Sequence, residues 1–299
     1  MKKFTVTVGI AAYNEAANIS FLLEDILKQR CESFVLGRIV VVSDGSSDET
    51  AVIARRYDSS GVLVFDDGER RGKSVRSNEI LDISKDSDAV ILLDADIALL
   101  GDMVFESMIR CVKGGADLVS PELQALPPRS VFGCAVVAGH DLKRAMFSEW
   151  RGGKNIYQCH GAARAFSRKL LETFRFKGSI GEDAYSYLFV KKFGFRYVSL
   201  LDTAIAIRVP ETFRDHKKQS RRFLCSQDMF RDEFGSGNVF AEYRYPKALL
   251  AKHLFISFMK RPFSIAAYIC VMICIALFPS ESNVKKEVWT AASSSKKVR

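Results

Sequence analysis

The sequence lacks the cysteine spacing of a metal site or a disulfide framework. Its seven cysteines are scattered and odd in number, and no Cys-x-x-Cys pair occurs. Two of them, Cys270 and Cys274, lie inside an apolar run. Zinc sites and disulfide-rich domains both depend on regular cysteine spacing. We therefore expect reduced thiols in a cytosolic domain.

The sequence also lacks an apolar run of comfortable membrane-spanning length. The longest run, Phe263–Phe278, lies between two prolines, and as a helix it would reach roughly 24 Å, against about 30 Å for a hydrocarbon core. Basic residues flank both ends, so the positive-inside rule gives no orientation. A single span, an in-plane or re-entrant helix and a buried core helix all remain open. The preceding stretch 248–259 is typical of an interfacial helix near anionic lipid.

The sequence also lacks an even distribution of charge along the chain. The net charge is +9, from 44 basic and 35 acidic residues. Residues 1–207 carry 27 residues of each sign, whereas residues 208–299 carry 17 basic and 8 acidic residues. Nucleic-acid binding needs a basic surface, so the neutral two thirds of the chain argue against a nucleic-acid partner.

Three common phosphate-site motifs are absent or incomplete. No Gly-x-Gly-x-x-Gly follows the first predicted strand, which argues against a dinucleotide oxidoreductase. The run Gly68–Ser74 resembles a P-loop, but three residues separate its glycines where the motif needs four. The run Asp94-Ala95-Asp96-Ile97 lacks the Thr or Val of an aspartyl-phosphate phosphatase. All three classes are therefore disfavoured.

What the sequence does contain is a regular alternation of apolar runs and amphipathic patterns. Strands are predicted over residues 4–11, 38–42, 62–65 and 89–93, and helices over 15–29, 48–57 and 73–83. This order predicts a doubly wound sheet with right-handed crossovers. After Asp96 the alternation loosens, with a helix predicted over 103–113, a strand over 117–120 and a helix over 132–150.

Two aspartates close the most apolar predicted strand. Asp94 and Asp96 directly follow the run 89–93, at the sheet edge where α/β proteins bind ligands. Neighbouring carboxylates are costly unless a cation or hydrogen-bond donors satisfy them, and their hard oxygens suit Mg²⁺ or Mn²⁺. The pair indicates a metal site beside a phosphate-bearing substrate, although capping the next structural element is an alternative.

The other predicted strand ends carry polar groups that suit a nucleotide diphosphate. The first is followed by Tyr13, Asn14 and Glu15, the second by Asp44, and the third by Lys73. An acidic residue just past a strand can accept hydrogen bonds from a base or a ribose, and a lysine can offset diphosphate charge. Turn formation explains Asn14 and Asp44 equally well, and Lys73 taken alone is also explained as a solvated surface residue.

The order and spacing of these motifs resemble glycosyltransferase family 2, the inverting enzymes with a GT-A fold. The resemblance rests on Ala12-Tyr13-Asn14-Glu15, on Asp44-Gly45-Ser46-Ser47-Asp48-Glu49-Thr50, on Gly72-Lys73 with Asn78, and on Asp94-Ala95-Asp96. Farther along, Gly161 and Arg164 lie in a stretch similar to the acceptor-side segment, Gly181-Glu182-Asp183 matches the ED motif, and Gln219-Ser220-Arg221-Arg222-Phe223 matches QxxRW. Ala11 and Phe223 stand where the family has Pro and Trp. In processive members of the family the QxxRW motif holds the polymer, and Phe223 in place of Trp weakens that inference for this chain.

The resemblance implies a nucleotide-sugar site with a divalent cation. Asp44 would hold the nucleobase, and Tyr13 and Glu15 would line the base and ribose pocket. Asp96, assisted by Asp94, would bind Mn²⁺ or Mg²⁺, which neutralises charge on the leaving diphosphate. The complete implied nucleotide-sugar set is Ala12, Tyr13, Asn14, Glu15, Asp44, Ser46, Lys73, Asp94, Ala95, Asp96, Arg221 and Arg222.

The resemblance also implies a general base. Asp183 would take the proton of the acceptor hydroxyl, with Glu182 beside it. The alternative is that these two residues only cap the helix predicted over 184–193. Further candidates for contacts with the sugar or the acceptor are His160, Gly161 and Gln219, although His160 is also explained as a structural histidine.

We therefore expect an α/β chain with a GT-A, doubly wound, mostly parallel sheet flanked by helices. Residues 1–240 would form the glycosyltransferase domain, with a nucleotide-binding half (1–100) and an acceptor-side half (101–240). Residues 241–299 would form a membrane-associating helical segment and a basic tail.

The expected activity is metal-dependent, inverting transfer of a sugar from a UDP- or GDP-linked donor to a glycan or lipid-linked acceptor, without a nucleic-acid partner. The protein would act at the cytoplasmic face of a membrane, as a peripheral or single-pass protein. Two alternatives remain: a polyprenyl-phosphate sugar synthase, whose acceptor is already ionised, and a catalytically silent binding protein on the same scaffold.

Overall fold

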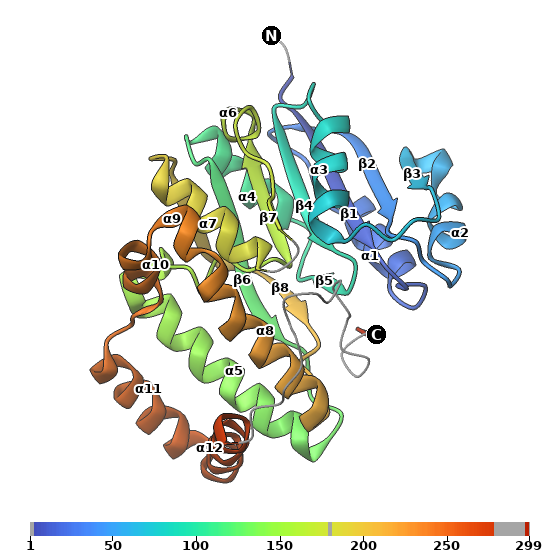
Figure 1. Cartoon of the computed structure of the whole chain (residues 1–299). Helices are drawn as coiled ribbons and strands as arrows, with labels where there is room; N and C mark the ends of the chain where they lie inside the picture. The colour runs from blue at the N-terminus through green and yellow to red at the C-terminus, as the bar shows by residue number, and fades with distance from the viewer. Residues whose placement is uncertain (1–2, 179–180, 278–296, 299) are drawn as a thin grey trace.

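One mixed sheet runs through the structure, a computed structural model that describes residues 3–178, 181–277 and 297–298, without the side chains of 222–228 (Figure 1). Within these residues the sheet has eight strands in the order β3-β2-β1-β4-β7-β6-β8-β5. The strands are β1 Thr5–Ala12, β2 Val35–Ser43, β3 Val62–Asp66, β4 Ala89–Asp94, β5 Ile97–Leu99, β6 Leu118–Ala125, β7 Ala163–Ser167 and β8 Tyr197–Ile207.

The first four strands of the sheet order are parallel to one another. β1 pairs in parallel with β2 and β4, and β2 with β3. Each parallel pair needs a crossover connection, which the intervening helices supply. β7 then joins β4 and β6 in antiparallel fashion, and β6 pairs in parallel with β8. The predicted doubly wound, mostly parallel α/β sheet is confirmed, and the β4–β7 pair joins both halves of the chain in one sheet.

The helices flank the sheet and fill its connections. They are α1 Ile19–Leu27, α2 Thr50–Arg55, α3 Lys73–Ile83, α4 Val104–Lys113, α5 Val131–Glu149, α6 Arg168–Leu171, α7 Glu182–Lys192, α8 Phe213–Met229, α9 Arg231–Phe234, α10 Ser236–Tyr243, α11 Lys247–Lys260 and α12 Pro262–Leu277, with 3-10 turns at Asp58–Ser60 and Trp150–Gly153. The first helix begins at Ile19, four residues later than predicted, because the Glu15 carbonyl closes a turn by accepting from the backbone N–H groups of Asn18 and Ile19.

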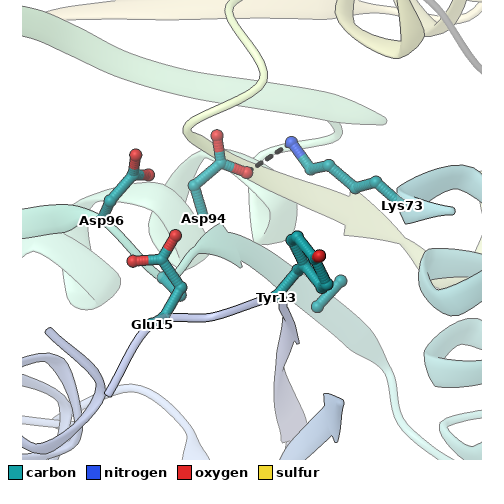
Figure 2. A pocket seen from close by; sticks show the side chains of 7 residues that line it. Tyr13, Glu15, Lys73, Asp94 and Asp96 are labelled. Atoms are coloured by element: carbon teal, nitrogen blue, oxygen red, sulfur yellow. Dashed lines mark ion pairs between the residues drawn. The ribbon is translucent and has the colours of Figure 1, made fainter. Parts of the chain in front are cut away.

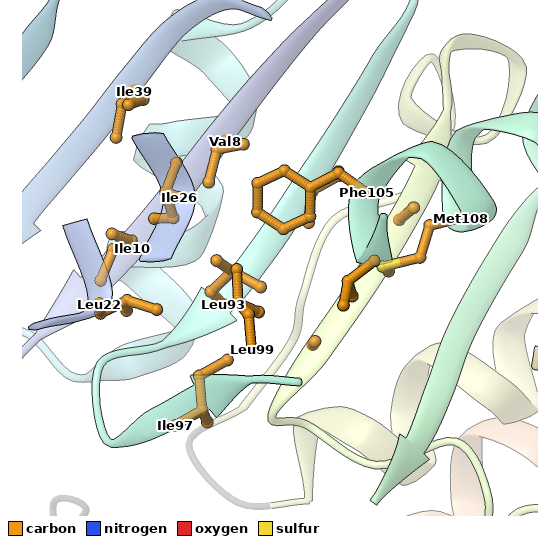
Figure 3. Packing of buried hydrophobic residues seen from close by; sticks show 14 of the residues in the cluster. Val8, Ile10, Leu22, Ile26, Ile39, Leu93, Ile97, Leu99, Phe105 and Met108 are labelled. Atoms are coloured by element: carbon orange, nitrogen blue, oxygen red, sulfur yellow. The ribbon is translucent and has the colours of Figure 1, made fainter. Parts of the chain in front are cut away.

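Alternate residues of β4 face two separate hydrophobic clusters. Ile91 and Leu93 belong to one cluster with residues of α1 and α4, and Figure 3 shows Leu22, Ile26 and Phe105 around Leu93. Val90 and Leu92 face the other cluster, which includes residues of α3 and α7. A strand covered on both faces is apolar at every position, which explains the unbroken run 89–93. The sheet therefore lies between two helical layers, and the strand ends are held at a fixed edge.

The C-terminal helices pack on α5 and on each other rather than on the sheet. Figure 1 shows α11 and α12 beneath α5, on the side of the molecule away from β2 and β3. Tyr268 of α12 lies directly over Gly139 of α5, and Ile265 packs with Leu142. Among the residues that the structure describes, no helix combines the length and the apolar character that crossing a membrane requires.

A glycine in β1 permits the close approach of α3, the helix that begins with Lys73. A Cβ on Gly9 would collide with the side chain of Ile80 and lie 3.1 Å from Leu92 Cδ2. We expect Gly9→Ala to lower the free energy of unfolding by about 1–3 kcal/mol through overpacking. The control is Gly37→Ala in β2, where the nearest atom would be at 3.5 Å. Urea unfolding of both variants tests this, and equal stabilities would contradict it.

Candidate functional site

The carboxyl ends of β1 and β4 form the floor of a small polar pocket. Its lining residues are Ala11, Tyr13, Glu15, Lys73, Asp94, Ala95 and Asp96. Parallel neighbours end at the same sheet edge, so the loops after β1 and β4 meet there. Figure 2 shows Asp94 turned toward Lys73, with Asp96 and Glu15 beside it. Six of these seven lining residues, all except Ala11, belong to the twelve residues predicted to bind the nucleotide sugar. Half of the predicted set therefore lies together in the structure.

Lys73 forms ion pairs that join three elements. Its ammonium, at the start of α3, contacts Asp94 at the end of β4 and Glu182 at the start of α7. Burial opposes the charge on Lys73, but these two carboxylates raise its pKa above the usual value. Desolvation and the nearby Asp96 raise the pKa of Asp94 to about 6, against the opposing effect of Lys73. The pocket thus contains a charge network that spans 109 residues of sequence, from 73 to 182.

Glu182 and Asp183, the two predicted members of a catalytic pair, have different surroundings. Glu182 contacts Lys73 and the buried Arg164, and despite desolvation these cations lower the pKa of its carboxyl group. The Asp183 Oδ1 atom accepts a hydrogen bond from the backbone N–H of Ala184 at 2.8 Å. A Cβ placed on Gly161 would lie 3.8 Å from the Cβ of Asp183 and 3.6 Å from the Lys73 ammonium. Asp183 therefore lies next to the pocket.

The first two motifs are cross-linked by hydrogen bonds. Asn14, with a positive φ of 52°, accepts from the backbone N–H of Ser47 at 2.8 Å through its side-chain oxygen. The backbone N–H of Asn14 donates to Ser46 Oγ at 3.1 Å, and that of Glu15 to Thr50 Oγ1 at 2.7 Å. Asn14 and Ser46 thus brace the loops after β1 and β2. Their predicted contact with a nucleotide stays a prediction.

Asp44 holds the loop that leads into α3. Its carboxylate accepts from the backbone N–H groups of Arg71 at 2.7 Å and Gly72 at 2.9 Å, and from Arg76 Nε at 3.2 Å. Arg76 is itself buried and also binds Asp67. Asp44 therefore fixes the residues directly before Lys73, and its predicted contact with the nucleobase stays a prediction.

Sequence reasoning missed an arginine that lies against Tyr13, one of the residues that line the pocket. The Arg70 guanidinium lies 3.3 Å from the centroid of the Tyr13 ring, in a cation–π contact. The only sequence signal was its position two residues before Gly72-Lys73, and nothing in that spacing identified Tyr13 as its partner. Arg164 was noted only as part of a family-like stretch, and its contact with Glu182 was not predicted.

His160 has the surroundings of a structural histidine. It is buried, and its Nε2 atom lies 2.7 Å from the carbonyl oxygen of Pro121, to which the neutral ring donates. Burial lowers its pKa to about 4, so the ring is neutral at physiological pH. This environment favours the structural interpretation over contact with a substrate, which stays a prediction.

The QxxRW-like segment lies on α8. Gln219 and Arg221 belong to this helix, which packs against α9. The side chain of Arg222 lies outside the described residues. The predicted contacts of these residues with the diphosphate or the acceptor stay predictions.

The carboxylates of the pocket fit a hard divalent cation only with help from a ligand. Among the described residues no group of three or more His, Cys, Asp or Glu side chains is arranged to hold a metal. Asp94 and Asp96 nevertheless offer carboxylate oxygens at one place, and Mg²⁺ or Mn²⁺ is commonly bound by one or two carboxylates plus substrate phosphates. The donor set therefore fits a cation that arrives with a diphosphate.

The chain matches one protein-family model and several curated proteins. The model described as Glycosyl transferase family 2 matches residues 7–174. A 4,4'-diaponeurosporenoate glycosyltransferase from Staphylococcus aureus is 33% identical over 106 residues, which cover 35% of this chain and 27% of that protein. The same enzyme from a second strain is 34% identical over 106 residues. The chain thus spans about a quarter of the length of these curated relatives.

Solved structures with the same fold are more distant in sequence. The mannosyltransferase PcManGT from Pyrobaculum calidifontis, in complex with GDP-Man and Mn²⁺, aligns with a TM-score of 0.58 and 19% identity over 92% of this chain and 76% of that one. Staphylococcus aureus TarS, in complex with UDP-GlcNAc, aligns with a TM-score of 0.56 and 17% identity over 91% of this chain and 80% of that one. At these identities the likeness shows the fold alone.

Three histidines that burial keeps neutral make stability sensitive to acid. The pKa values of His140, His160 and His216 are each lowered to about 4 by burial. Between pH 6.5 and 4 the unfolded chain binds protons that the folded chain does not, so the free energy of unfolding falls as pH falls. The variant His160→Gln keeps a hydrogen-bond donor for Pro121 but has one fewer buried histidine. Between pH 6.5 and 4 we expect its free energy of unfolding to fall by at least about 1 kcal/mol less than that of the unmodified protein. Urea unfolding at several pH values measures this, and an unchanged slope would contradict it.

Proposed function

The chain belongs to glycosyl transferase family 2, and from this premise we propose that it is a glycosyltransferase that moves a sugar from a nucleoside diphosphate to an acceptor hydroxyl with inversion. One observation carries the proposal. The carboxylates of Asp94 and Asp96 share a pocket with Lys73, and Asp183 lies at its border. A diphosphate and a proton acceptor can therefore be placed on two sides of one sugar ring.

The donor we propose is a UDP- or GDP-linked sugar. Tyr13 and Glu15 line the pocket, and Asp44 lies at the end of the neighbouring strand β2. These are the groups that would meet the base and the ribose. The relatives PcManGT and TarS were solved with GDP-Man and UDP-GlcNAc respectively, which supports nucleotide sugars as a class and favours neither base.

The cofactor we propose is Mn²⁺ or Mg²⁺ held by Asp96 with Asp94. Such a cation neutralises negative charge on the departing nucleoside diphosphate. PcManGT contains Mn²⁺ together with its donor, which supports this choice. Lys73, which contacts Asp94, would adjust the charge on the same side of the donor.

The step we assign to Asp183 is removal of the acceptor proton. As the acceptor oxygen forms its bond to the anomeric carbon, its proton passes to the Asp183 carboxylate. The bond from the anomeric carbon to the phosphate oxygen breaks, and the nucleoside diphosphate leaves with that electron pair. Attack from the face opposite the leaving group inverts the anomeric configuration. Glu182 is occupied by Lys73 and Arg164, so we assign it no proton transfer.

Two substitutions separate proton transfer from donor binding. We expect Asp183→Asn to lower kcat by about 10² to 10⁴ while donor binding persists. Asp96→Ala should weaken metal-dependent donor binding as well as turnover. The readouts are sugar transfer with Mn²⁺ and the thermal shift caused by each of a panel of nucleotide sugars, since a true donor stabilises the fold by mass action.

The matched control for these variants is Asp86→Asn, because the Asp86 side chain is 81% exposed. Full turnover by both Asp183→Asn and Asp96→Ala would refute the assigned mechanism. Tight donor binding by the unmodified protein without any transfer would favour the catalytically silent alternative. Retained activity of Asp183→Asn with a polyprenyl phosphate would favour the alternative synthase, whose acceptor needs no base.

The location we propose is the cytoplasmic face of a membrane, with peripheral attachment through α11 and α12. Phe255 and Met259 are each 67% exposed and Phe263 is 89% exposed. Residues 247–277 include four lysines and arginines and no acidic residue. Exposed apolar side chains on a segment that also carries lysines and an arginine suit the boundary between headgroups and acyl chains of an anionic bilayer. A lipid-linked acceptor would then be available at the same surface.

Vesicle binding tests this location. We expect the protein to sediment with phosphatidylglycerol-containing vesicles more than with pure phosphatidylcholine vesicles. Phe255→Ser combined with Phe263→Ser should weaken partitioning on the order of tenfold, because two exposed rings no longer insert. The control is Val52→Ser combined with Phe193→Ser, which removes exposed apolar groups from α2 and from the end of α7. Equal binding by both double variants would exclude α11 and α12 as the attachment surface.

A further inference from the structure

Arg164 is a buried cation on the strand between the pocket and α7. Its side chain is 1% exposed, and it lies on β7 opposite Leu92 of β4, two residues before Asp94. Its guanidinium faces the rings of Phe176 and Phe166, at 5.2 and 5.7 Å from their centroids. Lys73 contacts the start of α7 through the side chain of Glu182, whereas Arg164 also contacts its backbone.

We propose that Arg164 is a positioning residue, which fixes the first turn of α7 and thereby the carboxylate of Asp183. This inference rests on the proposed function, because it assumes that Asp183 is the base. The guanidinium donates from Nη1 to the backbone carbonyl of Glu182 at 3.0 Å and from Nη2 to Glu182 Oε1 at 3.2 Å. Arg164 thus holds both the backbone and the side chain of the residue before the base.

The peptide group on the other side of Asp183 is held as well. Arg164 Nη1 donates to Ser186 Oγ at 3.0 Å, and this hydroxyl donates to the backbone carbonyl of Asp183 at 2.8 Å. The two peptide groups that flank the Asp183 Cα are therefore both anchored, one directly by Arg164 and one through Ser186. Only the side-chain torsions of Asp183 remain to be set by its surroundings.

If Arg164 served only to fill space in the core, burying its guanidinium group would cost more free energy than burying an apolar side chain. Burying a guanidinium requires its desolvation, and a cation at a helix N-terminus faces the positive end of the helix dipole. Apolar residues of similar volume often replace buried ion pairs without loss of stability. Glu182 offsets the charge of Arg164, but a methionine would fill the space without needing it. The directed hydrogen bonds to α7 are the property that a methionine lacks.

The same network connects the base side of the site with the leaving-group side. Glu182 Oε1 contacts both Arg164 and Lys73, and Lys73 contacts Asp94. These contacts therefore fix the start of α7 relative to the pocket that would hold the diphosphate. Misplacement of a reacting group by about 1 Å can cost on the order of 100-fold in rate. Arg164 would act on catalysis by preventing such a displacement.

The test compares Arg164→Met, Arg164→Lys and Ser186→Ala in the full-length protein. We expect Arg164→Met to lower kcat by about 10- to 100-fold with the donor KM changed less than threefold. Arg164→Lys should restore part of kcat, and Ser186→Ala should lower kcat severalfold. The control is Arg168→Met, because Arg168 is 46% exposed and pairs with Asp88 at 3.6 Å. Donor-induced thermal shifts monitor binding and folding in each variant.

A double variant distinguishes positioning from a general structural role. If Arg164 acts through Asp183, the combination of Arg164→Met with Asp183→Asn should be no slower than Asp183→Asn alone. Additive losses would overturn the inference, as would unchanged kcat in Arg164→Met. If Arg164→Met does not fold, unchanged kcat in Ser186→Ala overturns it. Full activity of Asp183→Asn would instead refute the proposed base, and the positioning role with it.

Discussion

The ammonium group of Lys73 is the contact on which the geometry of the site depends. It is the first residue of α3, and it pairs with carboxylates at the end of β4 and the start of α7. Residues of α3, β4 and α7 also pack together in one hydrophobic cluster. A lysine between two largely buried carboxylates is stable only while both partners stay in place, because removing one leaves an uncompensated charge. The ion pairs therefore require the end of β4, the start of α3 and the start of α7 to keep one relative position.

The sequence was sufficient to predict that the residues at the ends of β1 and β4 lie together with Lys73. Four apolar runs separated by helical patterns imply parallel strands, and parallel strands end at one edge, so Tyr13, Lys73, Asp94 and Asp96 were expected together and lie together. The second half was less predictable. β7 contains Arg164 at its second position, which interrupts any apolar pattern, and β5 has only three residues. The pairing of Glu182 with Lys73 depends on how β7 joins β4, and no local pattern encodes that.

Several motif residues support the site through the backbone. Asn14, Ser46 and Asp44 were predicted to meet a nucleotide, and in the structure their polar atoms hold neighbouring loops. The two roles are compatible in principle, because a carboxylate has more lone pairs than Asp44 uses for Arg71, Gly72 and Arg76. Bracing of this kind is invisible in a sequence, since both partners belong to motifs that are read separately. Arg70 and Arg76 were missed for the same reason: each acts on a residue of another loop.

The charge balance of the pocket gives a physical reason to expect a cation with the donor. The charged residues that line it are Glu15, Asp94, Asp96 and Lys73, which sum to two negative charges when all are ionised. A nucleoside diphosphate is itself anionic, so it would enter a pocket of its own sign and be repelled. A divalent cation removes this excess, and its carboxylate and phosphate ligands are the oxygen donors that Mg²⁺ and Mn²⁺ prefer. This sum already includes the ammonium of Lys73, which contacts Asp94, so the remaining excess is the charge that the proposed cation would offset.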